Sequence, residues 1–311
     1  MRIGLVLPSK GDGAGPDSVD AAAEVAVRLG WTSVWTTDHM MVPPGAEAAE
    51  YGTILEALTT LAWVAGRHPK LKVGTSVVVP AMRDAVHLAK ELATIDVLSG
   101  GRLIVGVGVG DESDVPEWTN LGKADRFRVR GAYLDETIAI WRHLWAGRTE
   151  PFEGRFHRLE DYVFRPLPPQ GERLPIWSGG RSDKAVTRAA TLADGYHASQ
   201  TGPGDLRERL PDLLAQRSAA GRPPPTLSIR TRVKFDAPRG PVYSLVGRPQ
   251  DMQADLLAFD ELGVDDLIVV LDAVAPEAVV SAAERFDLQV VEPYRAAKAE
   301  REAVDREAWS M

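Results

Sequence analysis

The chain has 311 residues, of which 44% are hydrophobic and 26% charged, a composition typical of globular proteins. Its 44 acidic residues outnumber the 36 lysines and arginines, and the net charge of -8 argues against a nucleic-acid-binding face. Cysteine is absent, which excludes a disulfide scaffold, a thiolate metal site and a cysteine nucleophile. The length suits either two ordinary domains or one α/β barrel.

The apolar residues at the N-terminus form a short run, Ile3 to Leu7, that ends at Pro8. This run is too short for a signal peptide, and no cleavage-site pattern follows it. No stretch of about 18 apolar residues occurs elsewhere, so we expect no membrane span. The expected location is therefore the cytoplasm.

Eight short apolar segments have the length and flanking turn residues of β-strands. In chain order they are residues 3–7, 33–37, 71–79, the segment after Gly100-Gly101, 174–177, 195–199, 227–235 and 266–271. Helical patterns lie between them: about 17–29, a helix opened by the capping box Thr53-x-x-Glu56, one with Leu88, Leu92 and Ile95 inward, one with Leu134, Ile138, Trp141 and Trp145 inward, one ending near 193, 205–219, and helices starting near 249 and 276.

This alternation of strands and helices predicts one fold. Strands joined by helical crossovers are parallel, and eight such units over this length indicate a TIM (β/α)8 barrel. We therefore expect a single barrel domain over residues 1–311, with insertions at its C-terminal mouth at about 111–130 and 150–172. A charged tail, expected to be helical, covers about 295–311.

The fourth predicted strand ends in alternating glycines, Gly106, Gly108 and Gly110, followed at once by Asp111. The spacing does not match the dinucleotide fingerprint G-x-G-x-x-G, because the third glycine of that motif would fall on Asp111 or on Ser113. Two interpretations remain. The glycines allow a ligand to lie against the backbone, or they allow a neighbouring segment to pack closely.

A TIM barrel carries its active site at the C-terminal ends of its strands, so residues just after each strand are the candidates. Asp38 and His39 follow the second strand. A carboxylate beside a histidine raises its basicity and selects its tautomer, which makes an acid–base group usable near neutral pH. In isolation this pair would be an ordinary loop sequence; its position at a strand end favours catalysis.

The fifth strand is followed by Ser178, Gly179, Gly180, Arg181 and Ser182. Backbone amides of a Gly-Gly turn, two hydroxyls and a guanidinium at a helix start favour a phosphate site, although a simple helix cap is the alternative. The six histidines include no His-x-x-x-His pair, and we expect no metal site. No Gly-x-Ser-x-Gly elbow indicates a serine nucleophile.

Several segments together resemble the bacterial luciferase-like family of flavin- and deazaflavin-dependent oxidoreductases. The similar segments are Trp35 to His39, Gly74 to Pro80, Leu174 to Gly180, Ala193 to Gly195, and above all LAKELATIDVLSGGRLIVGVG from Leu88 to Gly108. The resemblance extends over nearly the whole chain. Within the family, the sequence is most similar to the branch that uses coenzyme F420, an 8-hydroxy-5-deazaflavin.

The resemblance implies roles for matching residues. His39 would face the reacting edge of the ring with Asp38 beside it, and a non-prolyl cis peptide at Ser76-Val77 would back the ring. Gly108 and Gly110, with Asp111 after them, would line the ring or the phosphate path, and residues 178–182 would hold the phosphate. Asp111 and the segment 114–118 depart from many relatives, which affects the expected substrate pocket.

Three functions agree with the resemblance. The first is F420-dependent hydride transfer to or from a small organic substrate. The second is a two-component monooxygenase that uses reduced FMN and oxygen, with a separate reductase as its partner. The third is a non-catalytic, flavin-binding member of the family. Relatives also imply a homodimer, and we expect no nucleic-acid or membrane partner.

Overall fold

The eight predicted strands form a closed parallel barrel. The computed structural model describes residues 1–309, apart from the side chains of residues 47 and 305–309. Strand pairing runs β1-β2-β3-β4-β7-β8-β9-β11, and β11 pairs again with β1 to close the barrel. The barrel strands are β1 (Arg2–Val6), β2 (Ser33–Thr36), β3 (Lys72–Thr75), β4 (Leu103–Val107), β7 (Ile176–Gly179), β8 (Gly195–Ser199), β9 (Thr226–Phe235) and β11 (Asp266–Leu271). The predicted TIM barrel is thus confirmed.

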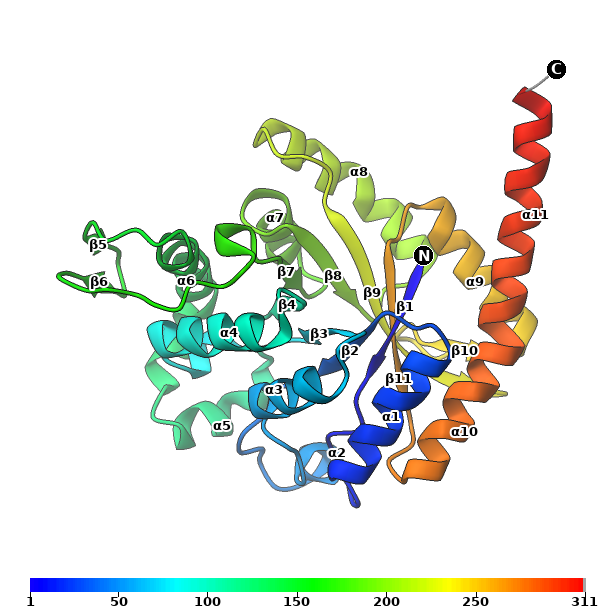
Figure 1. Ribbon diagram of the computed structural model, residues 1–311, viewed down its shortest axis with the longest axis horizontal. Coiled ribbons are helices and arrows are strands. Elements are labelled where there is room, and N and C mark those ends of the chain that lie inside the picture. The colour runs from blue at the N-terminus through cyan, green and yellow to red at the C-terminus, as the bar shows by residue number, and fades with distance from the viewer. Residues whose placement is uncertain (310–311) are drawn as a thin grey trace.

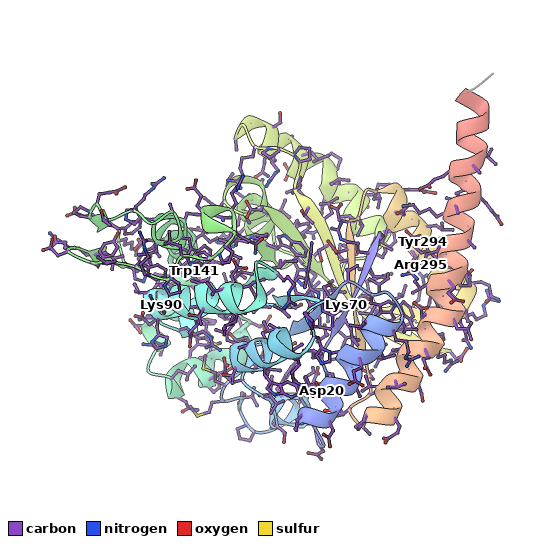
Figure 2. The ribbon with its side chains drawn as sticks, in the orientation of Figure 1. Asp20, Lys70, Lys90, Trp141, Tyr294 and Arg295 are labelled. Carbon is purple, nitrogen blue, oxygen red and sulfur yellow. The ribbon has the colours of Figure 1, made fainter. Side chains whose placement is uncertain are left out.

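Helices surround the barrel on its outside (Figure 1). They are α1 (Pro16–Arg28), α3 (Ala57–Arg67), α4 (Ala85–Ser99), α6 (Arg130–Trp145), α7 (Asp183–Thr191), α8 (Pro203–Ala219), α9 (Pro249–Glu261) and α10 (Pro276–Phe286). The predicted tryptophan stripe of α6 packs inward. Trp141, labelled in Figure 2 where α6 lies against α4, donates its indole N–H to the Ala85 carbonyl at 2.9 Å. Trp141 and Trp145 are both fully buried.

Two other tryptophans fill the inside of the barrel. Trp35 of β2 and Trp177 of β7 stack with ring centroids 5.3 Å apart. They occupy the space above strand glycines: a Cβ on Gly74 would lie 2.4 Å from the Trp35 ring, and one on Gly195 would lie 2.6 Å from Trp177. The His197 ring also stacks on Trp35 at 5.3 Å and lies 6.1 Å from Trp177. These rings form the floor beneath the barrel mouth.

Gly106 in β4 and Gly108 just after it make room for a neighbouring segment. A Cβ on Gly106 would lie 2.1 Å from the Thr75 carbonyl oxygen, and a Cβ on Gly108 would lie 2.5 Å from Val77 Cγ2. A Cβ on Gly179 would also be too close to Val77, at 2.8 Å from its Cγ1. The close-packing interpretation of these glycines therefore applies to Gly106, and Val77 projects between β4 and β7.

Replacing Gly106 with Ala should destabilise the barrel by about 1–3 kcal/mol or more, because the clashing atom is backbone and β3 must move away from β4. Urea unfolding followed by circular dichroism measures this. Gly66→Ala is the matched control: Gly66 lies within α3 with no atom within 4 Å of a new Cβ, so the same substitution should stabilise by up to about 1 kcal/mol. A Gly106→Ala protein as stable as the wild type would contradict the packing described.

Several elements differ from the predicted ones. Glu56 itself caps α3 by accepting from the Thr59 amide at 2.6 Å, so the predicted capping box led by Thr53 is wrong. A short helix, α2 (Ala46–Tyr51), precedes α3 without having been predicted, and the additional strand β10 (Leu245–Gly247) pairs with the end of β9. The predicted tail belongs to a helix, α11 (Glu292–Trp309), which continues from α10 through a π-helical turn and extends away from the barrel in Figure 1. Residues 310–311 of the predicted tail lie outside the described residues.

The two predicted insertions occupy different places. Residues 111–130 follow β4 and contain the 3-10 turn Glu112–Asp114, helix α5 (Val115–Asn120) and the 3-10 segment Ala124–Val129 at the mouth. Residues 150–172 lead from α6 back towards the start of β7. Their hairpin, β5 (Phe152–Glu153) and β6 (Arg158–Leu159), lies along α6, where Glu136 accepts from the Phe156 amide at 2.8 Å. The second insertion is therefore beside α6 rather than at the mouth.

Candidate active site

A cavity of about 590 Å³ opens at the C-terminal ends of the barrel strands, where the fold predicts a site. Its volume lies within the range of small-molecule pockets. Most of the residues predicted from the sequence line it: Asp38, His39, Ser76, Val77, Gly108, Gly110, Asp111, Gly179 and Gly180. The structure thus brings together the ends of β2, β3, β4 and β7.

His39 pairs with a carboxylate, but that carboxylate is Glu117 of α5. His39 Nδ1 lies 3.0 Å from Glu117 Oε2. The other carboxylate oxygen accepts from the backbone amides of Met40 and Met41, the latter at 2.8 Å. Glu117 is fully buried, so this arrangement clamps the loop after β2 onto the mouth insertion.

The pair shifts the pKa of each partner. Burial alone would lower the pKa of His39, but the hydrogen bond to Glu117 and its negative charge outweigh burial and raise the pKa above 6.5. Burial would raise the pKa of Glu117, but hydrogen bonds from His39, Met40 and Met41 lower it below 4.5. The ionised carboxylate only accepts, so Nδ1 carries the hydrogen and Nε2 is the basic nitrogen of the neutral ring.

Asp38 does not serve as the partner of His39, which corrects the prediction from sequence. Its carboxylate is buried and turned to the other side of the loop, where it accepts from Arg83 at 2.6 Å and from the Val79 amide at 3.1 Å. Asp38 therefore anchors the segment that follows Val77.

Asp114 lies close to the histidine pair. Its Oδ2 accepts from the Asp111 amide at 2.6 Å, which closes a tight turn after Gly110, a residue with a φ of 72°. Burial raises the pKa of Asp114. Ligand atoms of His39, Asp114 and Glu117 come within 4.8 Å of one another, a spacing that a metal ion could use. His39 and two backbone amides already bind the two Glu117 oxygens. This favours proton transfer over metal binding as the role of the three side chains.

The peptide bond between Ser76 and Val77 is cis, as the family resemblance implied. The Ser76 hydroxyl lies 2.8 Å from His197 Nε2, and His197 Nδ1 lies 2.8 Å from the Ser228 hydroxyl. Burial, with a smaller effect of the Arg230 charge, lowers the pKa of His197 to about 3. His197 is thus a neutral group that holds Ser76 in place, and its hydrogen bonds leave no ring nitrogen for catalysis.

The predicted phosphate cradle is divided between two cavities. Gly179 and Gly180 line the main cavity, whereas Arg181 and Ser182 line a neighbouring one of about 490 Å³ together with Gln200, Thr201 and Arg209. Ser182 caps α7 by accepting from the Ala185 amide at 3.3 Å. Ser178 lines neither cavity: its hydroxyl is buried and donates to the Ala185 carbonyl at 3.2 Å.

Two features of the site are absent from the sequence prediction. Glu117 could not be found because its partner is 78 positions away in the chain. The cationic residues of β9, Arg230 and Arg232, also line the cavity. The alternation of Arg230, Arg232 and Lys234 with apolar residues was the available signal, but it does not say which face of the strand points into the barrel.

Fold and cavity together define the class: a TIM barrel with a ligand-sized cavity and a histidine–carboxylate pair at its mouth. Within that class, the chain belongs to the luciferase-like monooxygenase family, whose sequence profile matches residues 1–237. This confirms the resemblance inferred from the sequence. Among the described residues, no helix is both long and apolar enough to cross a membrane.

Two curated relatives and one solved structure illustrate the similarity. The F420-dependent glucose-6-phosphate dehydrogenase of Kineococcus radiotolerans is 29% identical over 74% of this chain and 67% of its own length. The F420-dependent hydroxymycolic acid dehydrogenase of Mycobacterium tuberculosis is 28% identical over 70% of this chain and 58% of its own length. An F420-dependent secondary alcohol dehydrogenase in complex with an F420-acetone adduct superimposes with a TM-score of 0.77 at 18% identity, over 94% and 98% of the two chains.

Proposed function

We propose that this protein is an oxidoreductase that uses coenzyme F420 to take a hydride from the hydroxyl-bearing carbon of a small organic substrate. The observation that carries the proposal is His39, which lines the cavity and is hydrogen-bonded through Nδ1 to the buried carboxylate of Glu117. Nδ1 is held by Glu117, and among the described residues Nε2 has no hydrogen-bond partner. The names of the curated relatives, both F420-dependent dehydrogenases, support the choice of cofactor and reaction.

The chain offers a suitable place for the cofactor. Ser76, Val77, Gly108 and Gly110 supply a surface of backbone and small side chains on which a planar ring could lie, with Asp111 at its end. Gly179 and Gly180 lead from this surface towards Arg181 and Ser182 at the start of α7, where an anionic tail would meet backbone amides and a guanidinium. We therefore propose these residues as the cofactor contacts, with Ser178 in a supporting role through its bond to Ala185.

The residues divide the work of the reaction. When bound, the deazaflavin supplies a two-electron acceptor at C5 for the substrate's hydride. His39 Nε2 accepts the hydroxyl proton, so that a C–H and an O–H bond break while a carbonyl forms. Glu117 stabilises the imidazolium that results, since it is ionised and in direct contact with Nδ1. In the reverse direction the same histidine donates the proton.

Cofactor titration tests the proposal. The purified protein should bind F420 with saturable fluorescence quenching and, without oxygen, should reduce it in the presence of an alcohol from a panel that includes glucose 6-phosphate. FMN should bind more weakly. Tight binding of FMN without a response to F420 would contradict the proposal, and oxygen consumption with reduced FMN would then identify a two-component monooxygenase that needs a reductase. Cofactor binding without turnover on any substrate would favour the non-catalytic alternative.

We also propose that residues 1–311 act as one domain, that two copies form a homodimer and that the protein works in the cytoplasm. These proposals rest on the unbroken strand–helix alternation and on the family resemblance. Light scattering of the purified protein gives the mass of the assembly, with a dimer as the expected result and a monomer as the contradicting one.

A further inference from the structure

Arg230 is the cation that the proposed reaction does not use. It projects from β9 into the cavity, where one terminal nitrogen lies 3.5 Å from the Thr37 hydroxyl. Its Nε is completely buried and has no hydrogen-bond partner. Among the side chains that the structure describes, no carboxylate forms an ion pair with Arg230. Buried guanidinium groups are normally paired, so a cation left open towards a cavity indicates a missing anion.

The surrounding charges do not neutralise Arg230. Glu50 contacts both Lys10 and Arg232. Burial would raise the pKa of Glu50, but the hydrogen bond and charge of Lys10 outweigh burial and lower this pKa to about 2. Asp272 pairs with Arg232 at 3.1 Å and with Lys234 at 3.2 Å. The group therefore holds four cations, Lys10, Arg230, Arg232 and Lys234, against two carboxylates.

Two aromatic neighbours of Arg230, Tyr51 and His197, carry no charge at physiological pH. Burial and the charge of Glu50 raise the pKa of Tyr51 to about 12, so its phenol carries its proton at physiological pH. His197 is uncharged, because burial lowers its pKa to about 3. Neither ring offers the negative charge that would compensate the guanidinium.

The position of Arg230 relates it to the reacting group. Thr37, its contact, is two residues before His39, and the Tyr51 ring lies 4.4 Å from the His39 ring between centroids. Tyr51 and Glu50 come from α2 and line the same cavity as His39 and Arg230. A substrate whose hydroxyl meets His39 would thus place another group near Arg230.

We propose that Arg230 binds an oxyanion of the substrate, a carboxylate or a phosphate, and so makes acidic substrates the preferred class. This inference rests on the proposed function, because it assumes that the substrate shares the cavity with the cofactor. The planar guanidinium provides several N–H donors in a fixed fork that matches such groups.

The experiment uses the cofactor-loaded protein with inorganic phosphate and acetate as probes at constant ionic strength, and acetamide as the neutral analogue of acetate. Phosphate and acetate should produce a saturable change in the absorbance of bound F420, and acetamide should not. Arg230→Gln should weaken the oxyanion response about 10- to 100-fold, and Arg230→Lys should retain part of it. Arg28→Gln, an exposed residue of α1 that pairs with Glu284, is the control and should respond like the wild type.

The outcomes separate the two proposals. Absence of a saturable oxyanion response in the wild type, or an equal response in Arg230→Gln, overturns the role of Arg230 while the proposed function stands. A tenfold loss of F420 affinity in Arg230→Gln also overturns it, because Arg230 would then bind the cofactor. If the wild type binds no F420, the proposed function fails, and thermal stabilisation of the cofactor-free protein by phosphate and acetate then decides the role of Arg230.

Discussion

Replacing His39 with Asn should lower turnover by about 10²–10⁴-fold, the usual range for loss of a general acid–base group. Asparagine retains a side-chain N–H near the position of Nδ1, so the contact with Glu117 and the loop conformation should persist. It offers nothing at the position of Nε2, where the substrate proton would go. The loss should therefore fall on kcat, with F420 affinity changed by less than about threefold.

The substrate found in the cofactor assay provides the measurement, as steady-state kcat and KM without oxygen. His87→Asn is the matched control, because the His87 side chain is 74% exposed on the outer helix α4 and should not affect the reaction. Turnover of His39→Asn at a third of the wild-type rate or more would remove the histidine from the mechanism.

Replacing Glu117 with Gln should lower kcat by about 10²-fold or more and should also move the pH–rate profile. The amide can still accept from Met40 and Met41, but its NH2 group would face Nδ1 and favour the other tautomer of His39. The negative charge that raises the pKa of His39 would be lost. The rise of alcohol oxidation with pH should therefore begin at a lower pH than in the wild type.

The pH shift distinguishes a positioning role from simple loss of structure. Damage to α5 would lower the rate without moving the profile, whereas loss of the charge beside His39 moves it in one direction. Glu112→Gln is the control, since Glu112 is an exposed residue at the start of the same insertion. A rate loss with an unchanged pH profile would show that Glu117 acts only as a structural clamp.

The same pair makes a defined contribution to stability. The pKa of His39 is raised, so its stabilisation is complete below pH 6.5 and is lost as the pH rises through the folded value. The pKa of Glu117 is lowered, so its stabilisation is present above pH 4.5 and is lost as the pH falls through the folded value. Between these limits the ion pair stabilises the mouth insertion against the loop after β2.

Local sequence patterns predict the barrel well because each strand and helix carries its own periodicity. The eight strands, the outer helices and the position of the cavity follow from alternation and from the rule that parallel strands end at one face. The patterns are less informative where packing is not local. The glycines at the end of β4 were consistent with a ligand or with a neighbouring segment, and the Thr75 carbonyl decides for the latter only at Gly106.

The candidate site is limited in the same way. His39 can be identified because it follows a strand, but its partner comes from an insertion with no regular pattern, and Asp38, adjacent in sequence, turns to Arg83 instead. Ser178 follows a strand too, yet its hydroxyl is satisfied by Ala185 outside the cavity. Arg230 belongs to a regular alternation that does not distinguish the inside of the barrel from its outside.

The most direct test of the account is the protonation state of the His39 ring. Nitrogen-15 NMR of histidine-labelled protein with F420 bound, assigned with His39→Asn, reports the pKa and the tautomer without any substrate. We expect a pKa above 6.5 and a neutral ring protonated at Nδ1, with Nε2 bare. A pKa at or below 6.5, or a neutral ring protonated at Nε2, would contradict the account.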